Sequence, residues 1–329
     1  MLVLTRSQVR ELVPMPDAIA LMKTAFAELS AGRTISPLRT VVSLPDREAD
    51  ALFMPAYVPA MDALGLKSVN VFRRNARRGL PVIHAVVSLV DPETGQPLAL
   101  MDGTYLTALR TGAVTGAAAD LLARPESRVL AVVGAGAQGV TQIAAICAVR
   151  PIERVIAVDV DEQALERLRA AMARDWPELV DRLETTTDAS AAVRQADIVC
   201  TATTSRTPVF RDADLKAGTH VSGVGAYTPE MQEIPPETVA RATVVVDAVD
   251  AALAEAGDLI IPLNEGRVTR DHFQRELGML VSGQVPGRTS PAEITLFKSV
   301  GNAVQDVVVA KRAVDRARER GIGMEIDLS

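Results

Sequence analysis

The 329-residue chain carries 35 basic and 41 acidic residues, and its net charge of −6 argues against a nucleic-acid partner. Apolar residues make up 48% of the chain, so we expect about two globular domains rather than a disordered chain. Two distant cysteines, Cys147 and Cys200, and only three histidines leave no legible zinc site. The N-terminal residues lack the long apolar stretch of a signal peptide, and no membrane span is predicted, so we expect a soluble cytoplasmic protein.

The first third of the chain predicts a helix followed by a sheet. Apolar residues recur at helical spacing over 18–29, until Gly32 ends the pattern. Short runs typical of β-strands then follow at 40–44, 52–58, 64–72, 82–90 and 97–101. Such a series predicts an antiparallel sheet. Residues 103–123, rich in Ala, Leu and Thr, predict one long helix.

The middle of the chain predicts a dinucleotide-binding unit. Residues 129–133 form an apolar run typical of a buried parallel strand, and 140–149 predict the helix that follows. Between them lie three glycines. Gly134 permits a tight turn, Gly136 lets backbone N–H groups approach a pyrophosphate, and Gly139 allows the helix and the strand to pack closely.

Asp159 predicts which dinucleotide binds. It ends the second strand of the unit, where a carboxylate accepts hydrogen bonds from the adenosine ribose. The same carboxylate would repel a 2′-phosphate, and residues 160–162, Val-Asp-Glu, supply no Arg or Lys to bind one. We therefore expect NAD(H) to be favoured over NADP(H).

The rest of the chain continues the alternation of helices and strands. Helices are predicted at 161–174, after Asp188, at 250–259 and at 303–320, and strands at 197–203 and 219–224. We expect an α/β protein with a Rossmann-type, doubly wound parallel sheet over 120–305. Residues 1–119 together with 306–329 would form a discontinuous α+β domain, because the apolar face of the last helix can return to pack on it.

Three cations lie among apolar or small neighbours: Arg39, Lys67 and Arg110. Taken singly, such a charge is usually solvated or part of a structural ion pair. Arg110, however, falls in a predicted helix with almost no polar face, and Lys67 lies within a strand run. A cation in such surroundings needs an anion, and the carboxylate of a substrate would supply one.

At these positions the sequence resembles the ornithine cyclodeaminase and mu-crystallin family. The shared segments extend along nearly the whole chain: Met54-Pro-Ala-Tyr57, Gly65-Leu-Lys67-Ser-Val-Asn70, Met101-Asp-Gly103, Leu106-Thr-Ala-Leu-Arg110-Thr-Gly112, Gly134-Ala-Gly136-Ala137-Gln138-Gly139, Val224-Gly225, Ala256-Gly-Asp258-Leu259 and Thr295-Leu-Phe-Lys-Ser299-Val-Gly301. The resemblance implies a homodimer whose N-terminal substrate-binding domains pair through their sheets, with the substrate between those sheets and the nicotinamide.

Residue by residue, the resemblance implies that Arg39, Lys67 and Arg110 bind the substrate carboxylate and that Val300 faces the substrate. Beside the three glycines, the residues implied to line the dinucleotide are Ala137, Gln138, Asp159, Thr201, Val224 and Ser299.

One position departs from the cyclising members of the family. They carry an acidic residue two positions after the glycine of the Val-Gly motif, and here that position is Tyr227. A phenol is protonated at neutral pH, so it is a poor base and cannot pair with a second ammonium group as a carboxylate does. The segment 224–233 is instead similar to members that reduce cyclic imines such as Δ1-pyrroline-2-carboxylate.

We therefore expect NAD(H)-dependent reduction of Δ1-pyrroline-2-carboxylate, or of its six-membered homologue Δ1-piperideine-2-carboxylate, to the L-amino acid. Three alternatives stay open: an amino-acid dehydrogenase acting on alanine-like substrates, an ornithine cyclodeaminase in which Glu230 or Glu233 replaces the missing carboxylate, and a ligand-binding protein like mu-crystallin.

The candidate catalytic residues are Lys67, Arg110 and Tyr227. The carboxylate anchor would place the imine carbon near the nicotinamide for hydride transfer. A preprotonated iminium needs no acid, and otherwise Lys67, or a water held by Tyr227, would donate the proton. The competing interpretation of Tyr227 is that it only packs at a strand end.

Overall fold

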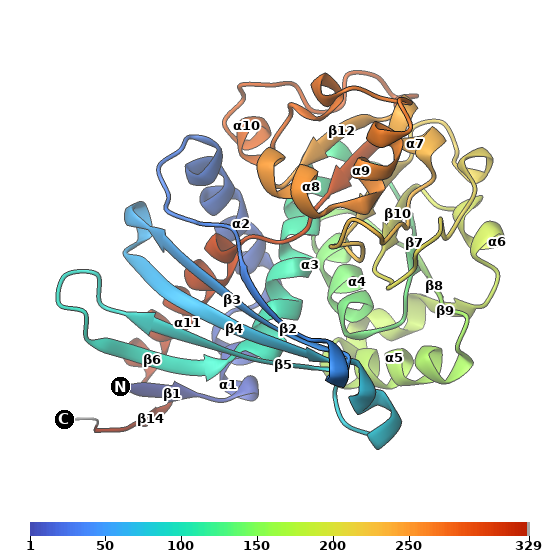
Figure 1. The fold of residues 1–329 in the computed structure, drawn as a ribbon. Helices are drawn as coiled ribbons and strands as arrows, with labels where there is room; N and C mark the ends of the chain where they lie inside the picture. The colour runs from blue at the N-terminus through green and yellow to red at the C-terminus, as the bar shows by residue number, and fades with distance from the viewer. Residues whose placement is uncertain (328–329) are drawn as a thin grey trace. The chain divides into compact units, whose positions relative to one another are not determined.

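A computed structural model describes residues 1–327, which divide into two compact units (Figure 1). Unit 1 comprises Met1–Arg110 and the segment that begins at Asn302, and unit 2 comprises Thr111–Gly301. The division therefore falls inside the long helix α3 (Gly103–Leu122), whereas the sequence predicted boundaries near 120 and 305. No helix within residues 1–327 is long and apolar enough to cross a membrane.

Unit 1 contains a seven-stranded sheet with the order β14-β1-β6-β5-β4-β3-β2. Its strands are β1 (Leu2–Leu4), β2 (Thr40–Leu44), β3 (Ala49–Val58), β4 (Ala63–Phe72), β5 (Ile83–Val90), β6 (Pro97–Asp102) and β14 (Met324–Glu325). The strands from β2 to β6 pair antiparallel in sequence order, which confirms the predicted antiparallel sheet. Strands β1 and β14 were not predicted, because strands of three and two residues are too short to show an alternation.

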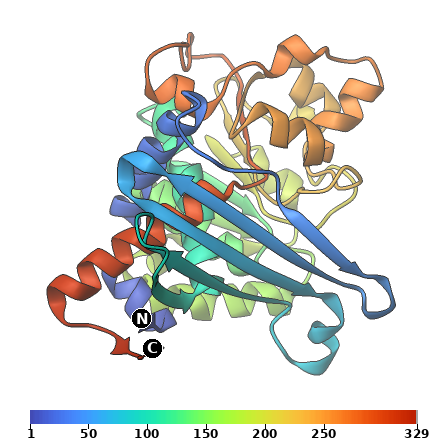
Figure 2. The ribbon, with the colours of Figure 1, turned by 60° about the vertical axis from the view of Figure 1, so that its left-hand side comes forward.

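Helices cover one face of this sheet. They are α1 (Arg6–Leu12), α2 (Met15–Ser30) and α11 (Ala303–Arg320). Although α11 is far away in sequence, it packs against β3, β4 and β5 and against α2, as Figures 1 and 2 show. Val304, Val307 and Val308 are fully buried on it, and the helix packs on the N-terminal strands. A Cβ on Gly65 would lie 2.4 Å from the carbonyl oxygen of Ser88 on β5 and 3.3 Å from a methyl group of Val307, so the glycine is required by the neighbouring strand and also gives α11 room.

The opposite face of the unit 1 sheet, here called the outer face, carries exposed apolar side chains. Register pairs Phe53 of β3 with Ser68 of β4, and Ser68 with Val86 of β5, so the three residues form one row across the sheet. Phe53 is 37% exposed and Val86 46% exposed. An exposed apolar sheet face is unusual for a unit that stays alone in water.

Unit 2 contains a seven-stranded sheet with the order β12-β13-β11-β10-β7-β8-β9. Its strands are β7 (Val129–Val133), β8 (Arg154–Val158), β9 (Leu183–Thr186), β10 (Ile198–Thr201), β11 (His220–Gly223), β12 (Thr243–Val246) and β13 (Thr295–Lys298). All neighbouring strands pair in parallel. Its helices, besides the end of α3, are α4 (Ala137–Val149), α5 (Glu162–Asp175), α6 (Ala189–Val193), α7 (Pro236–Arg241), α8 (Val249–Glu255), α9 (Gly257–Asn264) and α10 (Leu277–Val281).

Both faces of the unit 2 sheet are buried. Ala131 and Val133 of β7 belong to one hydrophobic cluster, while their neighbours Leu130 and Val132 belong to a second. Successive side chains of a strand point to opposite faces, so one cluster lies on each face of the sheet. This confirms the predicted Rossmann-type, doubly wound fold. Cys200 is buried in the second cluster, as expected of a small hydrophobic side chain.

Several details of unit 2 differ from the sequence prediction, and β9, α7 and α10 were not predicted. The helix predicted over 250–259 is divided at Ala256 into α8 and α9, and a Cβ on Gly257 would lie 2.1 Å from the carbonyl oxygen of Met231. The backbone therefore bends there to let two segments touch. Strands β12 and β13 were not predicted, because each has four residues and is buried on both faces, so it shows no alternation.

Candidate active site

In unit 1, a buried carboxylate brings two of the predicted cations together. Asp306 lies in the first turn of α11, and its Oδ2 is 2.8 Å from Nζ of Lys67 on β4. Nε of Arg110 on α3 donates to Oδ1 of Asp306 at 3.1 Å. Asp306 is fully buried, and Lys67 and Arg110 are only 1% and 7% exposed. One carboxylate therefore holds both cationic side chains.

The beginning of α11 explains why Asp306 is placed so firmly. Asn302 caps the helix, and the side chain of Gln305 accepts a hydrogen bond from the N–H of Asn302, completing a capping box. The same Gln305 oxygen accepts a hydrogen bond from Nη1 of Arg110 at 2.8 Å. The local sequence that starts the helix thus also orients the guanidinium.

The charges of this cluster do not balance. When Lys67 is protonated, two cations face one carboxylate, so Lys67, Arg110 and Asp306 leave one positive charge in a buried setting. A buried charge without a counter-ion is costly. The arrangement is therefore suited to receive one further anion.

The surroundings of Lys67 lower the pKa of its ammonium to about 7. Burial is the largest cause, because a desolvated ammonium loses the water that stabilises its charge. The positive charges of Arg110 and Arg39 lower the pKa further, and the negative charge of Asp306 raises it. Lys67 therefore exchanges its proton near neutral pH, the range in which a general acid or base is effective.

Arg39 is the third predicted cation. It comes directly before β2 and is half-buried. Its charge acts on the Lys67 ammonium. The structure thus joins Lys67 and Arg110 through Asp306 and brings the charge of Arg39 to bear on the same group.

In unit 2, the three glycines of the predicted phosphate loop differ in what surrounds them. Gly134 follows β7 with φ of +111°, and a Cβ on it would lie 2.5 Å from the carbonyl oxygen of Ala202. A Cβ on Gly139 would lie 2.3 Å from the carbonyl oxygen of Gly134. Both glycines are required by contacts within the protein. Gly136 is different, because a Cβ there would meet nothing within 4 Å.

Asp159 follows β8 and binds the backbone around it. Its Oδ2 accepts a hydrogen bond from the N–H of Ala135 in the glycine loop at 2.8 Å, and its Oδ1 accepts from the N–H of Asp161 at 3.0 Å. The sequence predicted only a ribose-binding carboxylate here. The structure shows that the same side chain also connects β8 to the glycine loop.

Several other predicted cofactor residues gather at the carboxyl ends of the parallel strands. Thr201 ends β10, Val224 follows β11, and Ala137 and Gln138 begin α4 after β7. Among the described residues, neither Oγ1 of buried Thr201 nor Oε1 of Gln138 has a hydrogen-bond partner. A doubly wound sheet binds its ligand at this edge.

Ser299 and Val300 follow β13 and are held by Asp247, which follows β12. Oδ2 of Asp247 accepts hydrogen bonds from the Ser299 hydroxyl at 2.8 Å, from the Val300 N–H at 2.9 Å and from the Gly301 N–H at 2.8 Å. Asp247 is fully buried. The loop that carries both predicted residues is therefore fixed by one carboxylate.

Tyr227 is half-buried in the loop after β11, and two nearby acids differ in their surroundings. Glu230 is exposed. Glu233 is fully buried, and its carboxylate accepts hydrogen bonds from Thr203, Gly225 and Ala226. Burial raises the pKa of Glu233, although its contacts and the charge of Lys298 oppose the shift. Because its oxygens are bound within the protein, Glu233 is not placed to replace the acid that Tyr227 lacks.

Asp306 and Asp247, the acidic residues that organise these two regions, were not predicted as site residues from the sequence, and Glu233 was named only as an alternative acid. One signal was available for Asp306. Residues 303–310 are apolar apart from Gln305 and Asp306, and an acid in such a run needs a buried cation. Asp247 gives a weaker signal, a single acid directly after an apolar strand.

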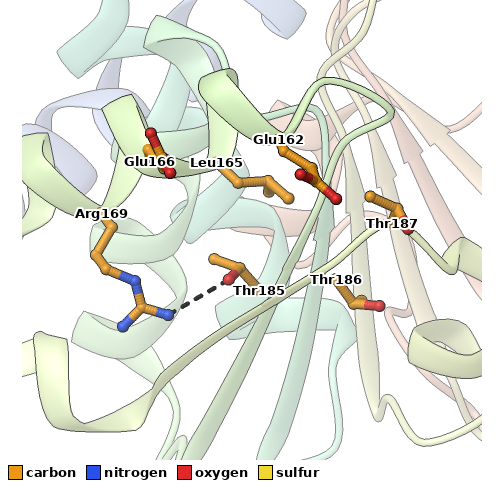
Figure 3. Close-up of a pocket in the computed structure, with 7 residues that line it drawn as sticks. All are labelled: Glu162, Leu165, Glu166, Arg169, Thr185, Thr186 and Thr187. Carbon is orange, nitrogen blue, oxygen red and sulfur yellow. Dashed lines mark hydrogen bonds between the residues drawn. The ribbon is translucent and has the colours of Figure 1, made fainter.

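A separate polar hollow of about 260 Å³ lies between α5 and β9 (Figure 3). Its lining residues are Glu162, Leu165, Glu166, Arg169, Thr185, Thr186 and Thr187. Nη2 of Arg169 donates to Oγ1 of Thr185 at 3.4 Å across it. None of the predicted site residues lines this hollow.

Known proteins resemble this chain along its whole length. The profile of the ornithine cyclodeaminase/mu-crystallin family matches residues 1–321. A Δ1-pyrroline-2-carboxylate reductase of Bacillus cereus is 41% identical over 330 residues, which cover 99% of this chain and all of the relative.

Solved structures agree with this match. The Δ1-pyrroline-2-carboxylate reductase of Thermococcus litoralis, in complex with NADH and L-proline, superposes with a TM-score of 0.94 at 39% identity and covers 99% of this chain and 100% of that one. An archaeal alanine dehydrogenase dimer with bound NAD gives a TM-score of 0.91 at 34% identity, covering 100% and 99% of the two chains. On these matches, the chain belongs to the ornithine cyclodeaminase/mu-crystallin family.

Proposed function

We propose that this protein is an NADH-dependent imine reductase that converts a small cyclic imino acid, Δ1-pyrroline-2-carboxylate or Δ1-piperideine-2-carboxylate, to the L-amino acid. The observation that carries the proposal is the buried cluster of Lys67, Arg110 and Asp306, which has one positive charge in excess and a lysine whose pKa is about 7. The Bacillus cereus and Thermococcus litoralis relatives, at 41% and 39% identity, are reductases of the same imine class.

The carboxyl edge of the unit 2 sheet fits a dinucleotide. The open space around Gly136 leaves room for a pyrophosphate at the N-terminus of α4, and the buried Oγ1 of Thr201 is without a partner among the described residues. Asp159, which follows β8, would bind the adenosine ribose, and exposed Val160 beside it offers no charge to a 2′-phosphate, which favours NAD(H) over NADP(H). When bound, NADH supplies the hydride for the imine carbon.

The protein's own residues bind the substrate and supply the proton. Arg110, Lys67 and Arg39 bind the substrate carboxylate, which neutralises the excess charge and fixes the position of the imine carbon. Lys67 then donates a proton to the imine nitrogen, because its ammonium gives up its proton near neutral pH. Hydride and proton together turn the C=N bond into a secondary amine, and water later returns the proton to Lys67.

Amino-acid dehydrogenase activity is the second candidate, and the archaeal alanine dehydrogenase is the observation that favours it. Reductive amination of a 2-keto acid passes through an acyclic imine that bears the same carboxylate, so the same cations would serve. Ornithine cyclodeamination is disfavoured, because Tyr227 supplies no carboxylate for the second amine and Glu233 is bound to backbone N–H groups.

We also propose that the outer face of the unit 1 sheet pairs with a second copy of the chain. Its row of Phe53 and Val86 is exposed, and burying such side chains in a dimer would remove them from water. The archaeal alanine dehydrogenase is a dimer, which supports the proposal. Light scattering of the purified protein tests it, and the double variant Phe53→Lys/Val86→Lys should be monomeric.

The decisive experiment is an assay of NADH oxidation with each candidate substrate in turn. We expect rapid oxidation with Δ1-pyrroline-2-carboxylate or Δ1-piperideine-2-carboxylate and slow oxidation with pyruvate plus ammonium. L-ornithine with NAD⁺ should release no ammonia. Faster turnover of pyruvate would favour the alanine dehydrogenase alternative, and joint release of ammonia and proline from ornithine would overturn the proposed function.

A further inference from the structure

Glu233 connects two loops at the carboxyl end of the unit 2 sheet. Its Oε1 accepts hydrogen bonds from the N–H and the hydroxyl of Thr203, at 2.6 and 2.9 Å, in the loop after β10. Its Oε2 accepts hydrogen bonds from the N–H groups of Gly225 and Ala226, at 2.7 and 2.9 Å, in the loop after β11. One carboxylate therefore sets the spacing between the two loops.

The two loops also touch directly. A Cβ on Gly225 would lie 2.2 Å from the carbonyl oxygen of Thr203 and 2.5 Å from Oε1 of Glu233. Such distances exclude any side chain, so the contact requires glycine at this position. The loops are thus packed as closely as their backbones allow.

Glu233 is itself held in place by a second buried acid. Oδ1 of Asp258 accepts hydrogen bonds from the N–H groups of Glu233 and Ile234, at 2.6 and 2.9 Å. Oδ2 of Asp258 is 2.9 Å from Nζ of Lys298, the last residue of β13. Glu233, Asp258 and Lys298 are all fully buried. Three buried charged residues are costly, and here they fix one carboxylate against the ends of three strands.

The strand order shows which half of a dinucleotide these loops serve. The order β9-β8-β7-β10-β11-β13 has two halves that meet between β7 and β10, and a Rossmann sheet takes one nucleotide on each half. Asp159, the candidate for the adenosine ribose, follows β8 in the first half. The loops joined by Glu233 follow β10 and β11, so they belong to the half that takes the nicotinamide nucleoside.

We propose that Glu233 is a positioning residue for the nicotinamide half of the cofactor site. It acts through the backbone of the loop that follows Thr201 and of the loop that carries Val224, and it leaves the adenosine half unaffected. The inference rests on the proposed binding of NAD(H), but it requires no particular substrate for the enzyme.

The test compares two ligands on one variant. In Glu233→Gln, an amide NH₂ replaces one oxygen and faces N–H donors, which drives the loops apart. Calorimetric titration should show that Kd for NADH rises about tenfold or more, while Kd for ADP, which lacks the nicotinamide nucleoside, stays within about twofold of wild type. Glu233→Asp, with a shorter reach but the same charge, should recover part of the NADH affinity.

Glu293→Gln is the matched control. Glu293 also accepts hydrogen bonds from two backbone N–H groups, those of Thr289 and Ser290, and from the hydroxyl of Thr243. It lies at the opposite edge of the same sheet, where β12 and β13 begin. This variant should bind both NADH and ADP like wild type.

Thr203→Val provides a milder variant that removes one of the four hydrogen-bond donors to Glu233. It should raise Kd for NADH about threefold and leave Kd for ADP unchanged.

An equal loss of affinity for NADH and for ADP in Glu233→Gln would overturn the inference, and so would unchanged NADH affinity in both Glu233→Gln and Thr203→Val. Wild-type protein that binds ADP but not NADH would contradict the inference and the proposed cofactor together. Because no imine is present, an unexpected substrate preference has no effect on the result.

Discussion

The two units use carboxylates in opposite ways. In unit 1, Asp306 binds two cationic side chains, Lys67 and Arg110, and neutralises one of their two charges. In unit 2, Asp159, Asp247 and Glu233 bind backbone N–H groups of the loops around them. The first arrangement sets charge and proton affinity, and the second sets the shape of loops. Substitutions in unit 1 should therefore alter pH dependence and substrate turnover, and substitutions in unit 2 should alter cofactor affinity.

The largest expected effect tests whether unit 1 acts on substrate alone. Arg110→Ala should lower kcat/KM for the imine about 30-fold or more, since the loss of a desolvated, charge-assisted contact costs roughly 2–5 kcal/mol. Its Kd for NADH should stay within about threefold. Arg33→Ala, which removes an exposed cation paired with Glu28, is the control and should behave like wild type. Unchanged kinetics in Arg110→Ala on every carboxylate substrate would remove this residue from the site.

The pH profile sharpens the comparison, because only unit 1 should govern it. In the wild type, kcat/KM should fall as the pH rises through about 7, since Lys67 then loses the proton that it donates. Asp306→Asn removes a charge that raises the pKa of Lys67, so the fall should move to lower pH and the rate at neutral pH should drop about tenfold. Arg110→Ala should move the fall to higher pH.

Asp315→Asn is the control for this shift, since Asp315 pairs with Lys311 on the same helix near its exposed surface. It should leave the profile unchanged. In Lys67→Met, the remaining kcat/KM should not fall as the pH rises through 7. A wild-type profile that stays flat through neutral pH would rule out Lys67 as the proton donor.

The choice between NADH and NADPH tests the role of unit 2. Asp159→Ser together with Val160→Arg removes the carboxylate and supplies a cation for a 2′-phosphate, so the preference should move towards NADPH by about tenfold. The ratio of kcat/KM with NADH to kcat/KM with NADPH measures this preference. The pH at which kcat/KM falls should be the same in the variant and in the wild type, because Lys67 is unchanged. Wild-type protein that already prefers NADPH would contradict the assignment of Asp159.

The smallest effect concerns Tyr227. If its hydroxyl orients a water or the substrate, Tyr227→Phe should lower kcat by about two- to tenfold, the range of one neutral hydrogen bond. Thermal unfolding of the variant should match the wild type. A rate equal to that of the wild type would mean that Tyr227 only packs at the end of β11.

Much of the fold followed from the sequence, because the patterns that carry it are local. The glycine loop and the long antiparallel strands can each be recognised within one short segment of the sequence. The same holds for the cations, whose apolar neighbours are adjacent in the chain. Asp306 was missed because it lies 196 residues from Arg110 in the chain, and only folding brings the two together. Strands β12 and β13 were missed because a four-residue strand buried on both faces looks like any short apolar run.

The return of α11 to unit 1 has a consequence for the order of synthesis. Every residue of unit 2 precedes Asn302, so all the strands of the parallel sheet are synthesised before α11. Until α11 emerges, the Lys67 and Arg110 side chains lack their carboxylate, and the sheet that carries Lys67 lacks one of its covering helices. A nascent chain that stops at Gly301 would therefore expose the apolar inner side of β3, β4 and β5 to chaperones. The last helix therefore covers the inner side of the unit 1 sheet and supplies the carboxylate for Lys67 and Arg110 in the same step.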